Sequence, residues 1–354
     1  MLDKLRVAVV GCGVGKVHVS AYRNLPEQYE LLAICDVDEA KAHQVAMDFG
    51  IPRVTTDFRE VCRMDDLDVI DICTPPYLHF SQIVEALTAG KHVICEKPLV
   101  GSLKEVDEIA RAEAAAGRRV MPIFQLRFGH GLQKLKLLVK EGVTGPAYLT
   151  TVETAWRRRA DYYAVPWRGK WQSELGGVLT THATHALDVL IYILGPVQST
   201  FARTITRVNP IEVEDCASAS FAMADGSLAS FSATLGSAAE ISRHRFCFRN
   251  LTAESNTKPY GNTGDPWAFT GDSPEWTERI NETLSRFVPQ PEGFEGQFSR
   301  FYSALRDGTE WPVTLADARL SLEALTAMYH SARTSQPVTL PLGKDHPLYA
   351  GWLP

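Results

Sequence analysis

The chain has 354 residues, about twice the length of a typical single domain, so we expect two domains. Apolar residues make up 45% of the sequence and charged residues 22%, an ordinary globular composition with enough apolar material for two cores. The formal net charge of −6 argues against a broad nucleic-acid-binding face, so we expect no nucleic-acid partner.

Targeting signals and cysteine usage indicate a compartment. The first residues lead into an apolar strand pattern without signal-peptide anatomy, and no apolar stretch approaches the roughly 20 residues that span a bilayer. The seven cysteines form no C-x-x-C pair; they are Cys12, Cys35, Cys62, Cys73, Cys95, Cys216 and Cys247. We therefore expect reduced, mostly buried thiols in a cytoplasmic protein without a disulfide frame, a zinc site or a membrane partner.

Short apolar runs alternate with amphipathic stretches in the first third of the chain. Nearly continuous apolar runs predict strands that are covered on both faces, at 5–10, 31–35, 69–73, 92–95 and 119–123. Helices are predicted between them at 17–25, 39–49, 78–89 and 103–116. Ser102 and Glu105 form a capping-box pattern at the start of the last helix. Repeated strand–helix–strand units predict a Rossmann domain, a doubly wound parallel sheet with right-handed crossovers, over residues 1–123.

The pattern changes after about Phe124. Asp225-Gly226 is a hairpin signal between two of the later strands. We expect strands at 148–154, 200–208, 213–223, 227–235, 243–251 and 338–340, with helices at 132–141, 181–194, 293–306 and 315–334. Residues 256–274 are rich in Gly, Asn, Pro and Thr, which predicts an extended surface loop. Residues 124–354 are thus predicted to form an α+β domain with a large, mostly antiparallel open sheet.

The first strand leads into the turn Gly11-Cys12-Gly13-Val14-Gly15, which is followed by a helix. Such a turn lets backbone N–H groups approach a pyrophosphate at the positive end of the helix dipole. The spacing is one residue shorter than the usual G-x-G-x-x-G, and a structural glycine turn would look similar. Asp36, at the end of the second strand, is placed to accept hydrogen bonds from the adenosine ribose of NAD and to repel the extra phosphate of NADP. We predict NAD as the cofactor; an ordinary strand-end turn is the alternative role of Asp36.

Three further segments carry a family resemblance: Thr74-Pro75-Pro76-Tyr77-Leu78-His79, Ala89-Gly90-Lys91-His92-Val93 and Cys95-Glu96-Lys97-Pro98-Leu99. With them, the chain resembles the glucose–fructose oxidoreductase, inositol dehydrogenase and rhizopine catabolism protein (Gfo/Idh/MocA) family. Gly176-Gly177-Val178-Leu179 and His185-Ala186-Leu187-Asp188 extend the resemblance over almost the whole chain. The resemblance implies a Rossmann domain followed by an α+β domain whose open sheet commonly forms dimers or tetramers.

The resemblance also implies roles for single residues. Lys97 would contact the reacting hydroxyl, and Glu96 would line the nicotinamide side. Thr74, Pro75 and His79 would lie along the cofactor. His185 matches the family's proton-transferring histidine. Many members carry an aspartate four residues before it, where this chain has Thr181 with His182 beside it, and on a continuous helix Thr181 and His185 would share a face.

These residue types suit alcohol oxidation. Hydride removal from a carbinol carbon requires the hydroxyl proton to leave, which a histidine can accept, while a lysine ammonium stabilises the developing alkoxide. Taken alone, a lysine after a strand is usually solvated and a helical histidine usually packs. Metal binding would be a competing use of His182, His185 and Asp188, but His182 and Asp188 would lie about 120° apart around a helix. We therefore expect no metal.

Aromatic and basic residues gather in the segment 162–171, just before the predicted helix at 181–194. Aromatic faces stack on sugar rings and basic side chains hydrogen-bond hydroxyls, so Tyr163, Trp167, Arg168 and Trp171 are candidate substrate contacts. A subunit contact or an arm packed on the sheet is the alternative. Arg127, just past the last Rossmann strand, is a further candidate, whereas Arg157-Arg158-Arg159 is predicted to be a solvated loop.

Two functions follow from these observations. The first is an NAD-dependent dehydrogenase for a secondary alcohol of a sugar, glycoside or inositol-like polyol, with Lys97 and His185 at the reacting oxygen and Thr181 and His182 beside the substrate. The second is a non-catalytic NAD-binding sensor or regulatory protein on the same fold. The Lys97 and His185 pair favours the enzyme, and the threonine at 181 favours the sensor.

Overall fold

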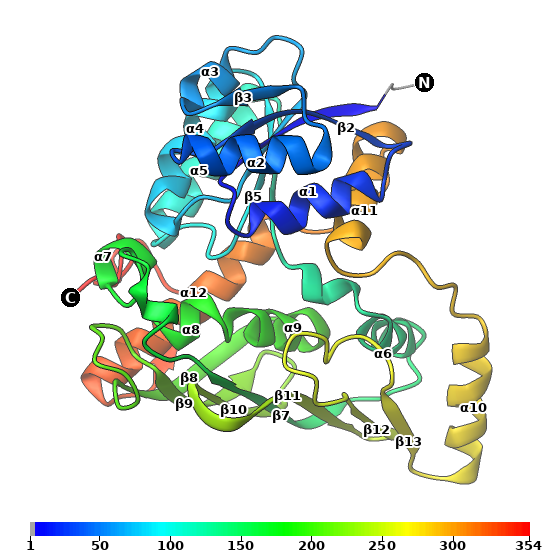
Figure 1. The fold of residues 1–354 in the computed structure, drawn as a ribbon. Helices are drawn as coiled ribbons and strands as arrows, with labels where there is room; N and C mark the ends of the chain where they lie inside the picture. The colour runs from blue at the N-terminus through cyan, green and yellow to red at the C-terminus, as the bar shows by residue number, and fades with distance from the viewer. Residues whose placement is uncertain (1–3) are drawn as a thin grey trace. The chain divides into compact units, whose positions relative to one another are not determined.

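The computed structural model describes residues 4–354, which divide into two compact units (Figure 1). The first unit comprises the chain up to Ile123 together with Phe294–Ala318, and the second comprises Phe124–Gly293 and Arg319–Pro354. The division between Ile123 and Phe124 lies where the sequence places its domain boundary. Residues 294–318 differ from the expectation, since they group with the first unit although the sequence analysis assigns them to the second domain.

A six-stranded parallel sheet forms the first unit, in the order β3-β2-β1-β4-β5-β6. Its strands are β1 (Leu5–Val10), β2 (Tyr29–Cys35), β3 (Arg53–Thr55), β4 (Val69–Ile72), β5 (His92–Cys95) and β6 (Val120–Pro122). Its helices are α1 (Gly15–Arg23), α2 (Glu39–Phe49), α3 (Phe58–Cys62), the 3₁₀ helix η1 (Pro76–Leu78), α4 (His79–Thr88), α5 (Leu103–Ala116) and α11 (Gly293–Asp307). The predicted doubly wound fold is confirmed.

Local chemistry accounts for the helix boundaries of this unit. Ser102 accepts a hydrogen bond from the Glu105 N–H at 3.1 Å, and Glu105 accepts one from the Gly101 N–H at 3.0 Å, so the predicted cap of α5 is present. Gly117 ends the same helix with a φ of +61°. The sequence analysis missed β3 and α3, because a three-residue, half-buried strand and a five-residue helix are too short to show a period.

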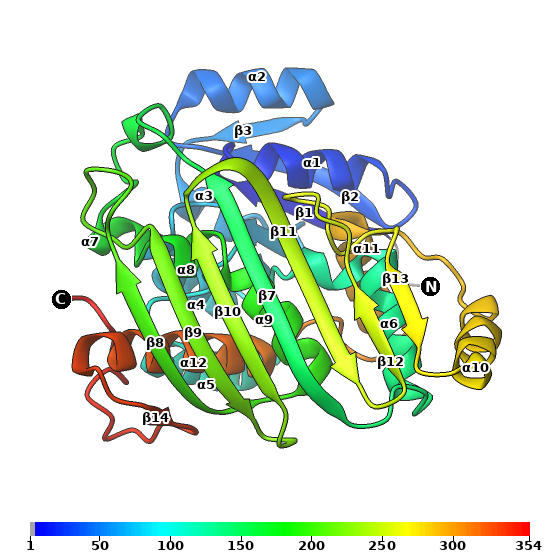
Figure 2. The same ribbon diagram turned by 90° about the horizontal axis from the view of Figure 1, so that it is seen from below.

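The second unit contains an eight-stranded sheet in the order β13-β12-β11-β7-β10-β9-β8-β14, seen in Figure 2. The strands are β7 (Ala147–Arg157), β8 (Val197–Ile205), β9 (Cys216–Met223), β10 (Leu228–Thr234), β11 (Gly236–Phe248), β12 (Leu251–Glu254), β13 (Ala268–Gly271) and β14 (Val338–Thr339). The pairs are antiparallel except β7 with β10, as predicted for a mostly antiparallel sheet. Buried and exposed residues alternate along β9 and β10, so one face is covered and the other is open.

Helices cover one face of this sheet. They are α6 (His130–Lys140), α7 (Trp171–Glu174), α8 (Val178–Thr181), α9 (Thr184–Leu194), α10 (Pro274–Ser285) and α12 (Leu315–Thr334), with the 3₁₀ helices η2 (Gln125–Phe128) and η3 (Tyr162–Ala164). The first turn of α12 groups with the first unit. On α12, Ser331 accepts a hydrogen bond from the Ala202 N–H of β8 at 3.0 Å, which ties that helix to the sheet.

The predicted helix at 181–194 corresponds to α9, but α9 begins only at Thr184, because the chain breaks the helix between α8 and α9. His182, between α8 and α9, has φ −123° and ψ −56°, outside the helical region. The Ala183 N–H bonds to the Val178 carbonyl, five residues back, while Thr181 donates its hydroxyl to the Gly177 carbonyl at 2.6 Å. Thr181 and His185 therefore do not lie one turn apart on a continuous helix.

The predicted surface loop at 256–274 is also partly wrong. It contains the edge strand β13 and buries Asn262, Thr263 and Trp267. Trp267 packs against Gly131, where a Cβ would lie 2.0 Å from its ring, and donates its indole N–H to the Asn262 carbonyl at 2.7 Å. The polar composition of segment 256–274 gives no sign of this packing. The sequence analysis also missed α10.

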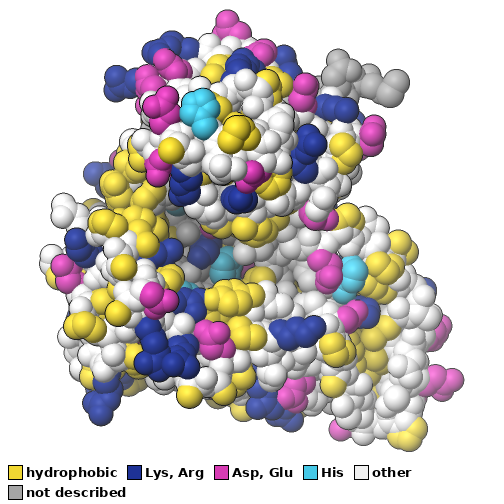
Figure 3. Space-filling view, viewed as in Figure 1, with side chains coloured by type: hydrophobic (Ala, Val, Ile, Leu, Met, Phe, Trp, Pro, Cys, Tyr) yellow, Lys and Arg dark blue, Asp and Glu magenta, His cyan; other side chains and the backbone are white. Residues whose placement is uncertain are grey.

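Two further properties concern the surroundings of the chain. In residues 4–354, no single helix is long and apolar enough to cross a membrane; one bent pair, Trp171–Thr181 with Thr184–Leu194, passes that test by length and composition alone. All seven cysteines are free thiols, and five of them are buried. On the face seen in Figure 3, acidic and basic side chains are interspersed over both units, without a broad basic patch on that face.

Candidate functional site

The glycine turn after β1 combines two packed positions with one open position. A Cβ on Gly11 would lie 2.6 Å from the Cys73 carbonyl oxygen, and its φ is +96°, so only glycine fits there. A Cβ on Gly15 would lie 3.0 Å from Val9 Cγ1, which lets α1 pack closely on the sheet. Gly13 has no neighbour within 4 Å of its Cβ position. Gly13 and Val14 are exposed just before α1 begins, so their backbone is open to a pyrophosphate.

Asp36 connects the end of β2 to this turn. Its Oδ2 accepts a hydrogen bond from the Cys12 N–H at 2.6 Å and its Oδ1 accepts one from the Asp38 N–H at 3.0 Å. Lys41 Nζ lies 3.8 Å from Oδ2. The side chain is partly exposed, and each carboxylate oxygen can accept a further hydrogen bond. Asp36 thus has a turn-forming role, and its remaining acceptor capacity suits ribose hydroxyls.

His79, predicted along the cofactor, has a fully buried side chain, and its cofactor role stays a prediction. Nε2 lies 2.8 Å from the Thr74 carbonyl oxygen, and Nδ1 lies 2.9 Å from the Pro98 carbonyl oxygen. Burial lowers the pKa of this imidazole, which favours its neutral form. His79 therefore joins the loop after β4 to the loop after β5.

These two loops present the remaining cofactor candidates. Thr74 and Pro75 are half-buried residues that follow β4. Glu96 and Lys97 follow β5, and Glu96 Oε2 accepts a hydrogen bond from the Lys97 N–H at 3.0 Å. Lys97 itself is half-buried. Because parallel strands end at the same edge of a sheet, the structure gathers the glycine turn, Asp36 and both loops at its carboxyl edge, where doubly wound folds bind nucleotides.

The sequence analysis missed a buried cluster at this edge, formed by His18, Tyr22, Asp71 and Cys73 around Glu96. An aspartate within the otherwise apolar strand β4 was the available signal, since a buried carboxylate needs a partner. His18, Asp71 and Cys73 offer ligand atoms within 4.8 Å of one another, as a metal site would. However, His18 Nδ1 lies 2.8 Å from Asp71 Oδ2, a hydrogen-bond distance, so in this structure the two groups pair directly with each other.

In the second unit, Arg127 forms a buried ion pair. Its guanidinium pairs with Asp188 of α9 through two bonds, Nε to Oδ2 at 2.8 Å and Nη2 to Oδ1 at 2.6 Å. The Arg127 side chain is 3% exposed and lies over the Tyr192 ring, 4.8 Å from its centroid. This buried pair fixes η2 against α9, the helix that also carries His185, and a substrate contact of Arg127 stays a prediction.

His182 takes part in a directional chain of hydrogen bonds. Arg158 Nε lies 3.1 Å from His182 Nε2, and His182 Nδ1 lies 2.6 Å from Thr181 Oγ1. Because an arginine can only donate, Nε2 must offer its lone pair, so the proton of the neutral ring lies on Nδ1. Thr181 accepts that proton's hydrogen bond and donates to the Gly177 carbonyl.

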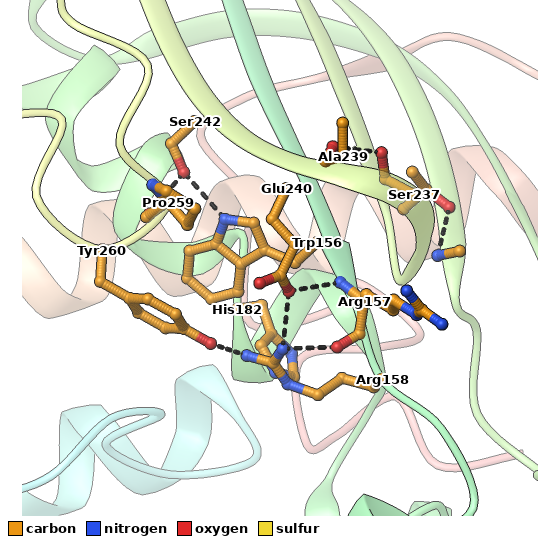
Figure 4. A network of polar contacts seen from close by, with 12 residues as sticks. Trp156, Arg157, Arg158, His182, Ser237, Ala239, Glu240, Ser242, Pro259 and Tyr260 are labelled. Carbon is orange, nitrogen blue, oxygen red and sulfur yellow. Dashed lines mark hydrogen bonds and ion pairs between the residues drawn. The ribbon is translucent and has the colours of Figure 1, made fainter.

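Figure 4 shows the residues around this chain of hydrogen bonds, and the sequence analysis missed most of these residues. Arg158, predicted to be solvated, has a side chain only 13% exposed; it contacts Glu240 Oε1 at 3.2 Å and the Tyr260 hydroxyl. The Trp156 indole N–H donates to Ser242 Oγ at 2.9 Å, and its ring lies 4.3 Å from the Tyr260 ring. We call Trp156, Arg158, Tyr162, His182 and Tyr260 the aromatic–arginine cluster.

Glu214 holds the glycine pair that precedes α8. Its carboxylate accepts hydrogen bonds from the Gly177 N–H at 3.0 Å, the Leu179 N–H at 3.0 Å and the Tyr329 hydroxyl at 2.9 Å. Gly177 packs so closely that a Cβ would lie 1.7 Å from the Glu214 carbonyl oxygen. Complete burial raises the pKa of Glu214 to about 7, although these hydrogen bonds oppose the shift. This residue fixes the start of the segment that carries Thr181 and His182.

Two family models match the chain. One is described as an oxidoreductase family with an NAD-binding Rossmann fold and matches residues 5–124, and the other is the GFO/IDH/MocA C-terminal domain and matches residues 132–249. The chain belongs to the Gfo/Idh/MocA oxidoreductase family. Its first unit is accordingly an NAD-binding domain, as predicted.

Individual relatives of this Gfo/Idh/MocA protein act on sugars and polyols, by their names. The D-glucoside 3-dehydrogenase of Escherichia coli K12 is 33% identical over 195 residues, which span 54% of each chain. The inositol 2-dehydrogenase of Rhodococcus erythropolis is 34% identical over 143 residues, 40% of this chain and 41% of the relative. The matched region therefore spans about half the length of these curated relatives.

One solved structure matches over nearly the whole chain. The WlbA dehydrogenase of Bordetella pertussis, in complex with NADH and UDP-GlcNAcA, is 28% identical with a TM-score of 0.85, covering 96% of this chain and 100% of that one. A levoglucosan dehydrogenase in complex with NADH and levoglucosan, 22% identical with a TM-score of 0.82, shares the fold.

The segment 162–171 of this Gfo/Idh/MocA chain packs mainly on its own unit. Arg168 lies 3.4 Å from Glu174 and over the Tyr162 ring, and the Trp171 indole donates to the Glu212 carbonyl at 3.0 Å. For Arg168 and Trp171, the packed arm is thus the better description. Tyr163 and Trp167 are half-buried and stay predictions as substrate contacts.

Proposed function

We propose that this chain is an NAD-dependent dehydrogenase that transfers hydride between a secondary alcohol of a sugar, glycoside or inositol-like polyol and the nicotinamide. The observation that carries the proposal is the gathering of Gly13, Asp36, Thr74 and Lys97 at the carboxyl edge of a Rossmann sheet in a family whose named relatives oxidise such alcohols. The family is shared by enzymes for several substrates, so the substrate class is the limit of the proposal.

The cofactor would be held by this chain's backbone and one carboxylate. The N–H groups of Gly13, Val14 and Gly15 at the start of α1 suit the pyrophosphate, and Asp36 suits the ribose hydroxyls. Thr74 and Pro75 would line the cofactor beside Glu96. NAD, when bound, accepts the hydride.

Lys97 and His185 would act on the substrate oxygen. The Lys97 ammonium stabilises the negative charge that develops on this oxygen as the hydride leaves the carbinol carbon. His185 takes the hydroxyl proton, so that the alcohol loses one hydride and one proton and becomes a ketone. His182 is a weaker candidate for this base, because its Nε2 lone pair faces Arg158.

The aromatic–arginine cluster supplies a surface for sugar recognition. Tyr260 is exposed and Tyr162 is half-buried, so both can offer an aromatic face for the C–H face of a pyranose ring, while the buried Trp156 packs beneath Tyr260. Arg158 has N–H donors for hydroxyl or carboxylate oxygens, and Glu240 partly balances its charge. We therefore propose this cluster, which includes His182, together with Thr181 as the substrate-facing part of the second unit.

The open face of the eight-stranded sheet suits self-association. Leu149, Phe201 and Leu228 are exposed there among serines of β9 and β10. We propose a homodimer or homotetramer through this face, in the cytoplasm, where the seven free thiols stay reduced. Light scattering of the purified protein tests the oligomer.

Nicotinamide absorbance tests the activity. Purified protein is incubated with NAD and a panel of glucosides, inositols, anhydrosugars and nucleotide-linked sugars, with Lys97→Met as the matched inactive control. We expect NADH formation with at least one panel member and none with Lys97→Met. A wild-type protein that binds NAD tightly and whose binding responds to a sugar, yet reduces no NAD with any of them, would support the non-catalytic sensor instead.

A further inference from the structure

A polar cluster lies fully buried at the carboxyl edge of the first unit's sheet. His18 comes from α1, Asp71 from β4, and Glu96 follows β5. The imidazole has no exposed surface. Its Nδ1 lies 2.8 Å from Asp71 Oδ2, and its Nε2 lies 3.1 Å from Glu96 Oε1. One ring thus bridges two carboxylates from two neighbouring strands.

This geometry favours a positively charged ring. A neutral imidazole has one N–H and one lone pair, so it can donate to only one of the two carboxylates. The other carboxylate would then face a lone pair in a buried site, which is strongly unfavourable. Both are satisfied when both ring nitrogens carry a proton. Burial by itself lowers the pKa of His18, but the negative charge of Asp71 outweighs it, and the pKa lies well above its usual value.

The remaining groups around the ring do not reverse this conclusion. Cys73 Sγ lies 3.3 Å from His18 Nδ1, and burial raises the pKa of this thiol, so it stays neutral. The Tyr22 hydroxyl donates to Asp71 Oδ2 at 2.9 Å, and the pKa of Tyr22 is raised as well. From α11, the rings of Phe294 and Phe298 lie 4.4 and 5.4 Å from the imidazole and exclude water.

The cluster reaches Lys97 through Glu96. While Glu96 Oε1 accepts from His18, Glu96 Oε2 accepts from the Lys97 backbone N–H at 3.0 Å. The position of the carboxylate therefore sets the direction in which the chain leaves β5 at Lys97. Without a charge on His18, Asp71 and Glu96 would lose the cation that lies between them, which is unfavourable in a buried site.

We propose that His18 is a positioning residue for hydride transfer: a doubly protonated imidazole that fixes the Glu96 carboxylate and, through it, the Lys97 backbone. The kinetic part of this inference rests on the proposed dehydrogenase function, whereas the protonation of His18 does not. Held in this way, the Glu96 carboxylate keeps one position at the nicotinamide side, and Lys97 meets the substrate oxygen in one orientation.

Nitrogen NMR of the cofactor-free protein labelled with ¹⁵N-histidine tests the protonation. The His18→Gln spectrum identifies the His18 signals. We expect both ring nitrogens of His18 to carry protons and to show no titration as the pH rises past the ordinary histidine pKa of about 6.5. A ring with a single N–H, or one that titrates near that value, would overturn the proposal, and this result does not depend on any substrate.

Kinetics with a substrate found in the panel test the positioning. In His18→Gln, kcat should fall roughly 10- to 100-fold, since a small displacement of a reacting group has effects of that size. NADH affinity, measured by fluorescence, should change far less. The acidic limb of the pH profile should change, because Glu96 loses the positive charge that faces it. Unchanged kcat, or a loss with an unaltered pH profile, would contradict positioning through Glu96.

Tyr22→Phe is the matched control, because it removes a hydrogen bond to Asp71 from the same cluster and leaves His18 and Glu96 in place. It should lower stability while keeping kcat and the pH profile. An equal loss of kcat in Tyr22→Phe would show that the cluster is structural only. If His18→Gln does not fold, Glu96→Gln provides the second test. The pKa of His18 should fall in that variant, and an unchanged pKa would contradict the proposed interaction between His18 and Glu96.

Discussion

Arg158 donates its Nε–H to His182 Nε2 across 3.1 Å, and this single bond separates the roles of two neighbouring histidines. A base must offer a lone pair to the substrate hydroxyl. The His182 lone pair at Nε2 is already directed at a guanidinium, and its Nδ1 faces the Thr181 hydroxyl. His185, the second residue of α9, is therefore the better candidate for the base.

Separate alanine variants test this assignment. His185→Ala should lower kcat by roughly 10²–10⁴, the usual size of a general-base contribution, and should abolish the acidic limb of the kcat/KM profile. His182→Ala should keep that limb and mainly raise KM for the sugar, since it perturbs the aromatic–arginine cluster. Steady-state kinetics across pH measure both. Loss of the limb in His182→Ala with its retention in His185→Ala would reverse the two roles.

Thr181 tests the break between α8 and α9. On a continuous helix, Thr181→Asp would place a carboxylate beside His185 and move the acidic limb to higher pH. In the structure, Thr181 Oγ1 instead lies 2.6 Å from His182 Nδ1, so we expect the limb to stay in place while KM for the sugar rises. Thr181→Val, which has the same shape but no hydroxyl, is the control for lost hydrogen bonding. A limb displaced to higher pH would mean that Thr181 does face His185.

Asp36 is expected to set the preference for NAD over NADP. A carboxylate near the added phosphate is unfavourable by about 1–4 kcal/mol at 4 Å, roughly a 5- to 1,000-fold difference in affinity. Asp36→Asn should narrow this gap by weakening NAD binding and strengthening NADP binding. Asp38→Asn changes the net charge equally, two residues away, and should leave the preference intact. Titration calorimetry measures the affinities of the three proteins for NAD and NADP. A wild-type preference for NADP would contradict the proposed role of Asp36.

Gly11 and Gly13 should respond differently to the same substitution. Gly11→Ala forces a Cβ to 2.6 Å from a carbonyl oxygen at a φ of +96°, so it should lower the free energy of unfolding by about 1–3 kcal/mol or more. Gly13→Ala has open space around the new methyl group and should leave the unfolding midpoint unchanged while weakening NAD binding. Urea unfolding and calorimetry measure the two effects. Normal NAD affinity in Gly13→Ala would exclude the turn from pyrophosphate binding.

The sequence predicts this fold well because the apolar periods are long and the caps are local. Segments 39–49, 103–116 and 315–334 are helices with the predicted bounds, since their hydrophobic period and their caps agree. The break at His182 could not be predicted, because it depends on Glu214, which holds Gly177 from another part of the chain. The return of 294–318 to the first unit likewise depends on long-range packing, such as that of Phe298 on Tyr22.

For the site, the sequence identifies residues in local motifs and misses those assembled from separate elements. Gly11, Asp36 and Lys97 are all found at strand ends. Arg158 looks like a solvated basic residue until Trp156 and Tyr260 are seen around it. Arg127 and His79 show the same limit: a polar residue near a motif can contact a ligand or hold the motif in place, and the sequence does not reveal that both side chains are buried against hydrogen-bond partners.

Glu214 makes the stability of the second unit depend on pH. Its pKa is raised from 4.5 to about 7, so the folded protein binds a proton there that the unfolded chain releases between these values. This contribution to stability is complete below about pH 4.5 and is lost as the pH rises to about 7, at most about 3 kcal/mol.

Glu214→Gln keeps an acceptor for the Gly177 and Leu179 N–H groups but cannot ionise. The difference in unfolding free energy between wild type and variant should therefore fall over this pH range and level off above it. Tyr329→Phe, which removes one hydrogen bond to the carboxylate, should raise the midpoint of that change, because the hydroxyl stabilises the ionised form. Urea unfolding at a series of pH values measures all three proteins, and a difference that does not vary with pH would show that Glu214 keeps one charge state throughout.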